Sequence, residues 1–334
     1  MRKIRRRKNQ RQKKVIIISS ICLLLCFCAG YAAFQTNISI TAKGNIIEST
    51  YTIEELKDNF CNTESGDGLY ADTYEEGRCV YKGSDPDNYI EFNNELWRII
   101  AIETDGTLKI VNLDSTLEKE YNTYSCSDYA NNELNGDRDA VSFFNYDCED
   151  DTLIIPWDGK NMYSYFGGTY NPLPDAPVPT LNTYLNTEYL NYIDSDYRSY
   201  IVSHDFYIGR VGISTAPISD LISNEKSSVW NGYIALPNVS DFIRASTSSE
   251  CMSGPTCGEE NYFAKENGTV REAYWFYTWA SNAMIYYFSR AYGYTTYTSI
   301  GTSTTLEVKP TLYLSEDISL TGRGTQSNPY KIVS

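Results

Sequence analysis

The sequence predicts an α+β fold, in which a single mixed domain of antiparallel strands, few short helices and long loops follows an N-terminal apolar helix. Three observations lead to this prediction. Runs rich in β-branched and aromatic residues alternate with turn dipeptides, while helix-capping patterns occur at few places. Tyr is used 30 times in 334 residues, and Asn, Ser and Thr are also abundant. Such a composition favours strands and turns over helical bundles.

The N-terminus predicts export from the cytoplasm. Residues 1–14 contain nine Lys or Arg and no acid, and residues 15–34 are apolar over a length that can span a bilayer. The basic flank stays inside, so the bulk of the chain is expected outside, at the cell membrane or in the extracellular space. Gly30, Ala32 and Ala33 offer the small residues that a signal peptidase needs, so a cleaved signal peptide and an uncleaved membrane anchor both remain open.

We therefore divide the chain into three parts: residues 1–34 as basic flank plus signal peptide or anchor, 35–60 as spacer and short helix, and 61–334 as the extracellular domain. Nine of the 28 basic residues lie in the flank, which leaves 19 against 43 acidic residues, a net charge of −24. A surface of this sign repels nucleic acid, so we expect no nucleic-acid partner.

The nine cysteines fall into two groups. Cys22, Cys26 and Cys28 lie in the apolar segment, where a thiol behaves as a small hydrophobic group. The other six form pairs that are close in sequence, and in an oxidising compartment we expect three disulfides: Cys61–Cys79, Cys126–Cys148 and Cys251–Cys257. Zinc is the competing interpretation, but the chain has no C-x-x-C pattern and a single His.

The first elements of the domain have clear local patterns. Thr52 and Glu55 form a capping box that opens a short helix ending at Phe60. Residues 88–114 predict a three-stranded meander, with a turn at Asn93–Asn94 and a type I′ hairpin turn at Asp105–Gly106.

The middle of the chain predicts a long irregular insertion followed by a helix. Residues 115–180 are rich in Asn, Asp, Gly and Pro. Thr180 is the expected cap of the next helix. One stripe at helical spacing is expected to face the core: Leu181, Leu185, Tyr189 and Tyr192.

The last third predicts mainly strands. Residues 206–213 and 231–246 suggest two strands, the second ending in a short helix, and Asn267–Gly268 suggests a hairpin turn. Strand patterns then follow at 273–281, 283–292 and 307–314. Val308, Leu312 and Leu314 share one face, and Pro310 suggests an edge position or a bulge.

Several stretches together resemble an uncharacterised family of exported domains from Gram-positive and gut bacteria. They are GLYADTYEEGRCVYKG (Gly68–Gly83), NYIEFNNELWRII followed by DGTLKIV, LNTYLN, VSDFIRAS, VKPTLYL and TGRGTQSNPYKI (Thr321–Ile332). The resemblance implies export, surface display and one α+β domain, distantly similar to C-type-lectin and formylglycine-generating-enzyme folds. The stretch AGYAAFQTNISI is similar to the export signals of biofilm-matrix fibre proteins, which implies cleavage just before Phe34.

An acidic loop is the candidate metal site. Residues 128–139 place carboxylate and amide oxygens around Gly136, within an expected cysteine loop. Oxygen ligands in one tight loop suit calcium, although the spacing matches an EF-hand only in part. The candidate ligands are Asp128, Glu133, Asn135, Asp137 and Asp139. A solvated acidic loop without metal is the alternative, and we expect no other cofactor.

An aromatic stretch is the candidate ligand-binding region. Eleven aromatic residues occur between Tyr274 and Tyr297, where one strand face is expected in the core and the other can contact a ligand. Exposed Tyr and Trp suit sugar stacking or a protein partner because they offer rigid area with a polar tip. The candidates are Trp275, Tyr277, Trp279, Tyr286, Tyr292, Tyr294 and Tyr297.

Catalytic patterns are weak. His204 is the only His, and its neighbours Ser203 and Asp205 would point to the opposite strand face, so we expect a surface or strand-end His. The sequence therefore predicts a non-catalytic binding or adhesion module for a glycan or a surface protein. A structural matrix or wall-associated component and an extracellular hydrolase acting through carboxylates are the alternatives.

Overall fold

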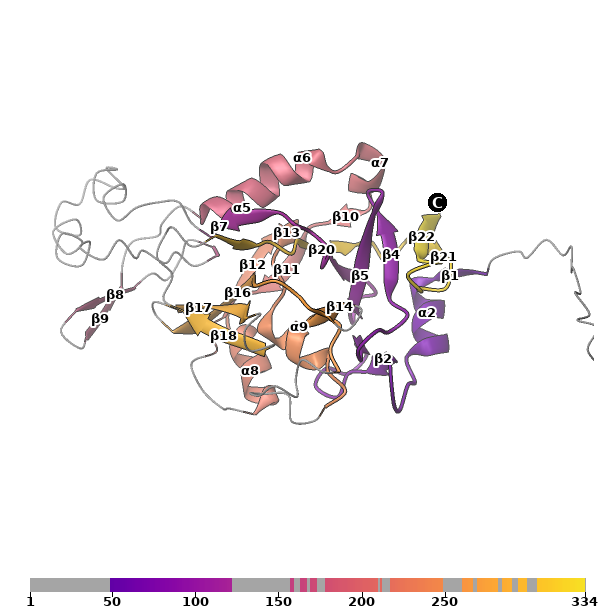
Figure 1. The fold of residues 1–334 in the computed structure, drawn as a ribbon, viewed down its shortest axis with the longest axis horizontal. Helices are drawn as coiled ribbons and strands as arrows, with labels where there is room; N and C mark the ends of the chain where they lie inside the picture. The colour runs from indigo at the N-terminus through magenta and orange to yellow at the C-terminus, as the bar shows by residue number, and fades with distance from the viewer. Residues whose placement is uncertain are drawn as a thin grey trace, which may run out of the picture. The chain divides into compact units, whose positions relative to one another are not determined.

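The computed structural model describes residues 49–121, 157–158, 163–166, 169–172, 178–209, 211, 217–248, 260–266, 269–281, 284–289, 294–298 and 305–333. They belong to one compact unit, Glu48–Ser334. Its fold is α+β, built mostly from strands with few short helices, as expected (Figure 1). The apolar segment 15–34 lies outside the described residues, and within them no helix is long and apolar enough to cross a membrane.

The described part of the larger sheet has eleven strands. Its main path runs β1-β21-β22-β4-β5-β6-β20-β10, with β3 on β5, β2 on β3 and β13 on β20. All pairs are antiparallel except β22 with β4. The bounds are β1 (Thr50–Thr52), β2 (Gly68–Ala71), β3 (Cys79–Lys82), β4 (Tyr89–Phe92), β5 (Glu95–Ile102), β6 (Leu108–Val111), β10 (Ile201–Val202), β13 (Ile234–Ala235), β20 (Thr311–Leu314), β21 (Ser319–Thr321) and β22 (Tyr330–Val333).

The predicted meander is the strand series β4-β5-β6 in the middle of this sheet. Its first turn is of type I′, because Asn93 and Asn94 have φ of 55° and 59° and the flanking residues Phe92 and Glu95 pair. The expected type I′ turn at Asp105–Gly106 is wrong, because only Gly106 has a positive φ, of 87°. Gly106 N donates to Glu103 O, and Glu103 N donates to Thr107 O, as in a three-residue hairpin loop.

The segment before Cys61 is part of the unit. Helix α2 (Ile53–Phe60) begins at the predicted capping box, in which Thr52 and Glu55 each bond the other's backbone N–H. Ile53 and Leu56 are buried, and β1 pairs with β21. Strand β1 and helix α2 therefore belong to the same compact unit as the residues that follow Cys61. The predicted Cys61–Cys79 disulfide is present.

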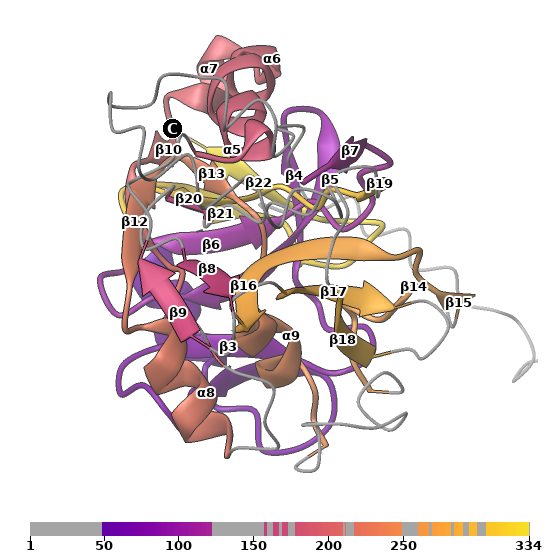
Figure 2. The same cartoon turned by 90° about the vertical axis from the view of Figure 1, so that its left-hand side faces the viewer.

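A helical segment with one π-helical turn follows the middle of the chain. It consists of α5 (Thr180–Tyr184), the π-turn η2 (Leu185–Tyr189) and α6 (Leu190–Tyr192), and α7 (Ser195–Arg198) comes next. Thr180 is not the cap, because Pro179 holds that position without a side-chain bond. Figures 1 and 2 show α5–α7 on one side of the larger sheet, and α8 (Ile218–Glu225) and α9 (Val239–Arg244) on the other.

The π-turn changes which side chains face the core. Leu181, Leu185 and Tyr189 are buried as predicted, but Tyr192 is 66% exposed, so its core assignment is wrong. Leu190 N donates to Leu185 O, five residues back. This wider turn contains one extra residue, so the residues after it are rotated around the helix axis relative to a regular α-helix. Ile193 occupies the buried position instead.

A second sheet has the order β18-β17-β16-β19-β7. Its strands are β7 (Glu118–Glu120), β16 (Tyr274–Ser281), β17 (Met284–Ser289), β18 (Tyr294–Thr298) and β19 (Thr305–Glu307). Three hairpins complete the described strands: β8 (Tyr163–Phe166) with β9 (Thr169–Pro172), β11 (His204–Tyr207) with β12 (Val229–Gly232), and β14 (Lys265–Glu266) with β15 (Thr269–Val270). The last confirms the hairpin predicted around Asn267–Gly268.

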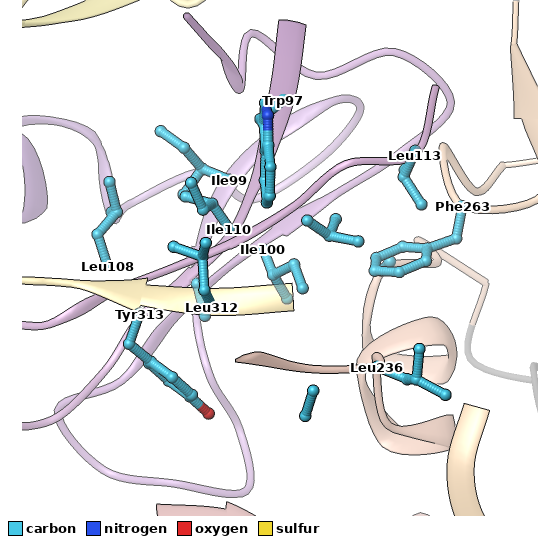
Figure 3. Packing of buried hydrophobic residues seen from close by; sticks show 14 of the residues in the cluster. Trp97, Ile99, Ile100, Leu108, Ile110, Leu113, Leu236, Phe263, Leu312 and Tyr313 are labelled. Carbon is cyan, nitrogen blue, oxygen red and sulfur yellow. The ribbon is translucent and has the colours of Figure 1, made fainter. Parts of the chain in front are cut away.

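The core lies against the long central strands. Figure 3 shows Trp97, Ile99 and Ile100 of β5 packed with side chains of β6 and β20, and with Leu236 and Phe263 from later in the chain. Val308, Leu312 and Leu314 are buried as predicted. Pro310 precedes β20, which pairs on both sides, so the proposed edge position is wrong. A proline just before a strand removes no ladder bond.

Candidate functional site

Most residues of the predicted sites lie outside the described residues. These are the calcium candidates Asp128, Glu133, Asn135, Asp137 and Asp139, the cysteines Cys126, Cys148, Cys251 and Cys257, and Tyr292. Both the calcium site and the two further disulfides therefore stay predictions. Among the residues that are described, no group of His, Cys, Asp or Glu is placed to hold a metal ion.

The aromatic strands form, but one of their candidate ligand residues faces the core. Trp275 has no exposed surface, and its indole Nε1 donates to Lys119 O at 3.1 Å. This bond joins β16 to β7 across the second sheet. Five further candidates lie on β16, β17 and β18, and the structure describes only their backbone: Tyr277, Trp279, Tyr286, Tyr294 and Tyr297. Ligand binding by these five residues stays a prediction.

His204 begins β11, in agreement with a strand-end position. Its Nε2 lies 3.1 Å from Asp105 Oδ2, and its ring stacks on Tyr313 with centroids 3.8 Å apart. Ser203 instead donates to Asn231 Oδ1. The His204–Asp105 contact therefore ties the β5–β6 hairpin turn to β11, and Ser203 is directed elsewhere.

A groove that the sequence did not indicate lies between the helical segment and the meander. We call it the tyrosine–glutamate groove; its volume is about 710 Å³. The lining residues are Glu95, Leu96, Asn112, Asp114, Ser115, Thr116, Leu117, Tyr184, Glu188, Tyr189 and Tyr192. They combine aromatic rings with carboxylate, amide and hydroxyl groups.

Local folding explains how these side chains meet. Glu95 follows the type I′ turn and begins β5, and the loop 112–117 begins where β6 ends. The π-turn then places Tyr184, Glu188 and Tyr192 toward this loop, while the neighbouring Leu185 stays in the core. Tyr189 and Tyr192 have ring centroids 6.1 Å apart and planes inclined by 38°, so one ring supports the other.

The carboxylates of the groove differ in how they are compensated. Asp114 Oδ1 accepts from Arg271 Nη1 at 2.8 Å, which balances its charge. Glu95 Oε2 accepts from the neutral amide of Asn112, at 2.8 Å. Neither Glu95 nor Glu188 forms an ion pair within the described part of the chain.

Burial and the nearby acids raise the pKa of two tyrosines in the groove. Burial, and then the charge of Glu188, raises the pKa of Tyr184. Burial, and then the charge of Glu95, raises the pKa of Tyr189. Each carboxylate is therefore close enough to a ring to act on it electrostatically.

Two further hollows adjoin the groove. One of about 490 Å³ shares Tyr184 and Glu188 with it and continues to β7, and Figures 1 and 2 both show α5 close to β7. The other, of about 420 Å³, shares Asp114, Ser115 and Thr116 and continues to Arg271 and Lys309. The three together form an extended polar surface around the loop 112–117.

A second concentration of charge lies in the interior. This buried charge cluster joins the β2–β3 connection, the β5–β6 hairpin and α9, and consists of Asp72, Glu75, Arg78, Glu103, Lys109, Asp241 and Arg244. Lys109 Nζ lies 2.7 Å from Asp241 Oδ2, and Arg244 Nη1 lies 2.8 Å from both Asp72 and Glu75. Every member is paired, which indicates a structural role.

Sequence reasoning missed the groove because each of its parts had an ordinary explanation. The stripe containing Tyr189 and Tyr192 fitted a core-facing helix. The one available hint was the run Tyr184–Tyr192, in which three tyrosines flank an acid. Comparisons with known protein families, curated proteins and solved structures found no match.

Proposed function

We propose that this chain is an exported bacterial cell-surface protein whose domain binds a glycan in the tyrosine–glutamate groove without catalysing a reaction. The N-terminal basic and apolar segments support the location. The resemblance to an exported domain family, distantly C-type-lectin-like, agrees with it. The groove supports the binding role.

The observation that carries the proposal is the exposed aromatic wall of the groove. Tyr192 is 66% exposed, although large aromatic side chains are normally buried in a core. Its ring is held by Tyr189 rather than left free in solvent. A rigid, exposed ring with a polar tip gives contact area at a low cost in conformational entropy, as in binding surfaces.

The remaining lining suits sugar hydroxyl groups. Glu95, Glu188 and Asn112 offer acceptor oxygens, and Ser115 and Thr116 offer hydroxyls that donate and accept. Flat rings beside such groups match the two faces of a sugar ring, one apolar and one polar. The groove continues into two neighbouring hollows, which suits an oligosaccharide better than a single small molecule.

An oligosaccharide array tests the proposal, with the full chain kept in detergent. The wild type is expected to bind a defined set of glycans, and Tyr192→Ala should weaken that binding by about tenfold, the equivalent of about 1.4 kcal/mol. Tyr233→Ala is the matched control, because Tyr233 is 45% exposed and does not line the groove. Equal binding by wild type and Tyr192→Ala would contradict the proposal.

A carboxylate hydrolase is the second candidate, since Glu95, Asp114 and Glu188 line one groove. Glycoside hydrolysis uses two such acids on either side of the bond that breaks. Release of reducing ends from a bound oligosaccharide, lost in Glu188→Gln, would favour the hydrolase. Binding without turnover would favour the binding module, and ligand-free assembly into filaments would favour a matrix component.

A further inference from the structure

The tyrosine–glutamate groove has an excess of negative charge. Glu95, Asp114 and Glu188 line it, and the lining contains no Lys, Arg or His. Arg271 compensates Asp114, whereas Glu95 and Glu188 form no ion pair with any residue that the structure describes. The hollow that leads to β7 adds Glu118 and Glu120 against Lys119 alone. An anionic ligand would be repelled along the groove and the hollow that leads to β7, whereas a cationic ligand would be attracted.

The tyrosine rings favour a cation for a separate reason. The face of an aromatic ring is electronegative and attracts ammonium groups. The protein provides an example at this site, since Lys119 Nζ lies 4.1 Å from the centroid of the Tyr184 ring. Tyr192 presents a further exposed ring in the same groove, supported by the mostly buried ring of Tyr189. An ammonium group placed between them would interact favourably with both the ring faces and the carboxylates.

The walls of the groove favour a sugar chain over a peptide. Extended peptides commonly add to an exposed strand edge, but β5, the strand that lines the groove, pairs with both β4 and β6. The end strand of the second sheet, β7, lines the neighbouring hollow and not the groove. A helical peptide needs an apolar groove, whereas this lining is mostly carboxylate, amide and hydroxyl. The hydroxyl groups of a sugar can form hydrogen bonds with these polar groups.

From these observations we propose that the groove selects oligosaccharides of de-N-acetylated amino sugars, whose free amines are protonated and lie between the tyrosine rings and the carboxylates of Glu95 and Glu188. This inference rests on the proposed glycan-binding function and adds the chemical class of the glycan. N-acetylation converts the ammonium into a neutral amide, so it removes the charge while keeping the sugar ring.

Calorimetric titration of the full chain with two matched probes tests the inference. The probes are a hexamer of β-1,4-linked glucosamine and the same hexamer fully N-acetylated. We expect the amine form to bind at least about tenfold more tightly, as charge-assisted hydrogen bonds add about that much over neutral ones. The preference should shrink as salt concentration rises, because exposed charge pairs are screened.

Charge variants connect the preference to the groove. The double variant Glu95→Gln with Glu188→Gln should lose the preference while still binding both probes weakly through the rings. Glu64→Gln with Glu76→Gln removes the same charge from exposed positions outside the groove and should keep the preference. If the first double variant melts at a lower temperature than wild type, Glu188→Gln alone gives the test, because Glu188 is exposed.

The outcomes separate the inference from the function on which it rests. Equal affinity for the two hexamers would overturn the inference and leave the glycan-binding proposal intact. Tighter binding of the amine form that persists in the Glu95 and Glu188 variants would also overturn it. Binding of an oligolysine peptide, with neither hexamer bound, would overturn both the inference and the glycan-binding function.

Discussion

The buried charge cluster and the tyrosine–glutamate groove both concentrate acidic side chains, but they treat them in opposite ways. In the cluster, Asp241 is 1% exposed and pairs with Lys109 at 2.7 Å. In the groove, Glu188 is exposed and forms no ion pair with any described residue. In the first arrangement, attraction between the paired charges offsets the free-energy cost of removing them from water, so the cluster has a structural role. The second leaves charge available to a ligand.

This comparison teaches that pairing, rather than the number of charges, separates the two roles. Both regions contain several carboxylates and both contact tyrosine rings. In the interior, each carboxylate of the buried charge cluster lies within ion-pair distance of a cation, as Asp72 does with Arg78 and Arg244. At the groove, Asp114 alone has such a partner among the residues placed by the structure, namely Arg271. Substitutions should therefore affect folding in one region and binding in the other.

The largest expected effect is on folding, from Asp241→Ala. The substitution leaves Lys109 buried without its carboxylate partner, and breaking a buried ion pair costs about 3–5 kcal/mol. Denaturant unfolding of the full chain measures this loss. Asp317→Ala is the control, since Asp317 is exposed in a turn and its loss should change the free energy of unfolding by at most about 0.5 kcal/mol. A loss as small for Asp241→Ala would contradict a structural role.

The second largest effect is expected from acid, which should lower the stability that the buried charge cluster contributes to the fold. Burial alone would raise the pKa of Glu75, but Arg244 and Arg78 outweigh it and lower that pKa from 4.5 to about 2. The pKa values of Asp72 and Asp241 are lowered too, against burial, by the neighbouring cations. The unfolded chain therefore takes up protons first, so stability is lost as pH falls from about 4.5 towards about 2. Melting temperatures over this range check the direction.

A smaller effect is expected on binding, from Tyr192→Ala. Loss of one exposed ring should weaken a bound glycan by about 1–2 kcal/mol, the range of a moderate interface contact. The free energy of unfolding should stay within about 0.5 kcal/mol of wild type, because the ring is 66% exposed. Titration and thermal melting on the same sample separate the two effects. A large drop in melting temperature would instead make Tyr192 a packing residue.

The smallest expected effect is that of Glu188→Gln on folding. The substitution removes a charge that has no described partner, so the free energy of unfolding should change by less than about 0.5 kcal/mol. Chemical denaturation checks this value. A loss of more than about 2 kcal/mol would show that Glu188 takes part in the fold and would remove the contrast with Asp241.

The sequence predicted local structure well where short-range chemistry decides it. The capping box at Thr52, the turn at Asn93–Asn94, the Cys61–Cys79 bridge and the hairpin around Asn267–Gly268 all follow from a few neighbouring residues. The Asp105–Gly106 turn differs because Gly alone takes the positive φ there. Composition alone could not distinguish the two turn types.

The candidate site could not be predicted, because it depends on long-range packing. The π-turn at Leu185–Tyr189 shifts the helical phase, and this shift exposes Tyr192 and buries Ile193. Glu95 and the loop 112–117 reach the same groove only through the meander, about 70 to 90 residues earlier in the chain. The sequence pattern favoured the aromatic stretch 274–297 as the binding region, although Trp275 within it is buried in the core.

The most direct test of the account compares hydrogen exchange of the full chain with and without the glucosamine hexamer. The account predicts slower exchange in the loop 112–117 and in the helical segment 180–192, with the aromatic strands 274–298 unchanged. Slower exchange confined to strands 274–298, with the groove unaffected, would show that the ligand binds elsewhere and would contradict the account.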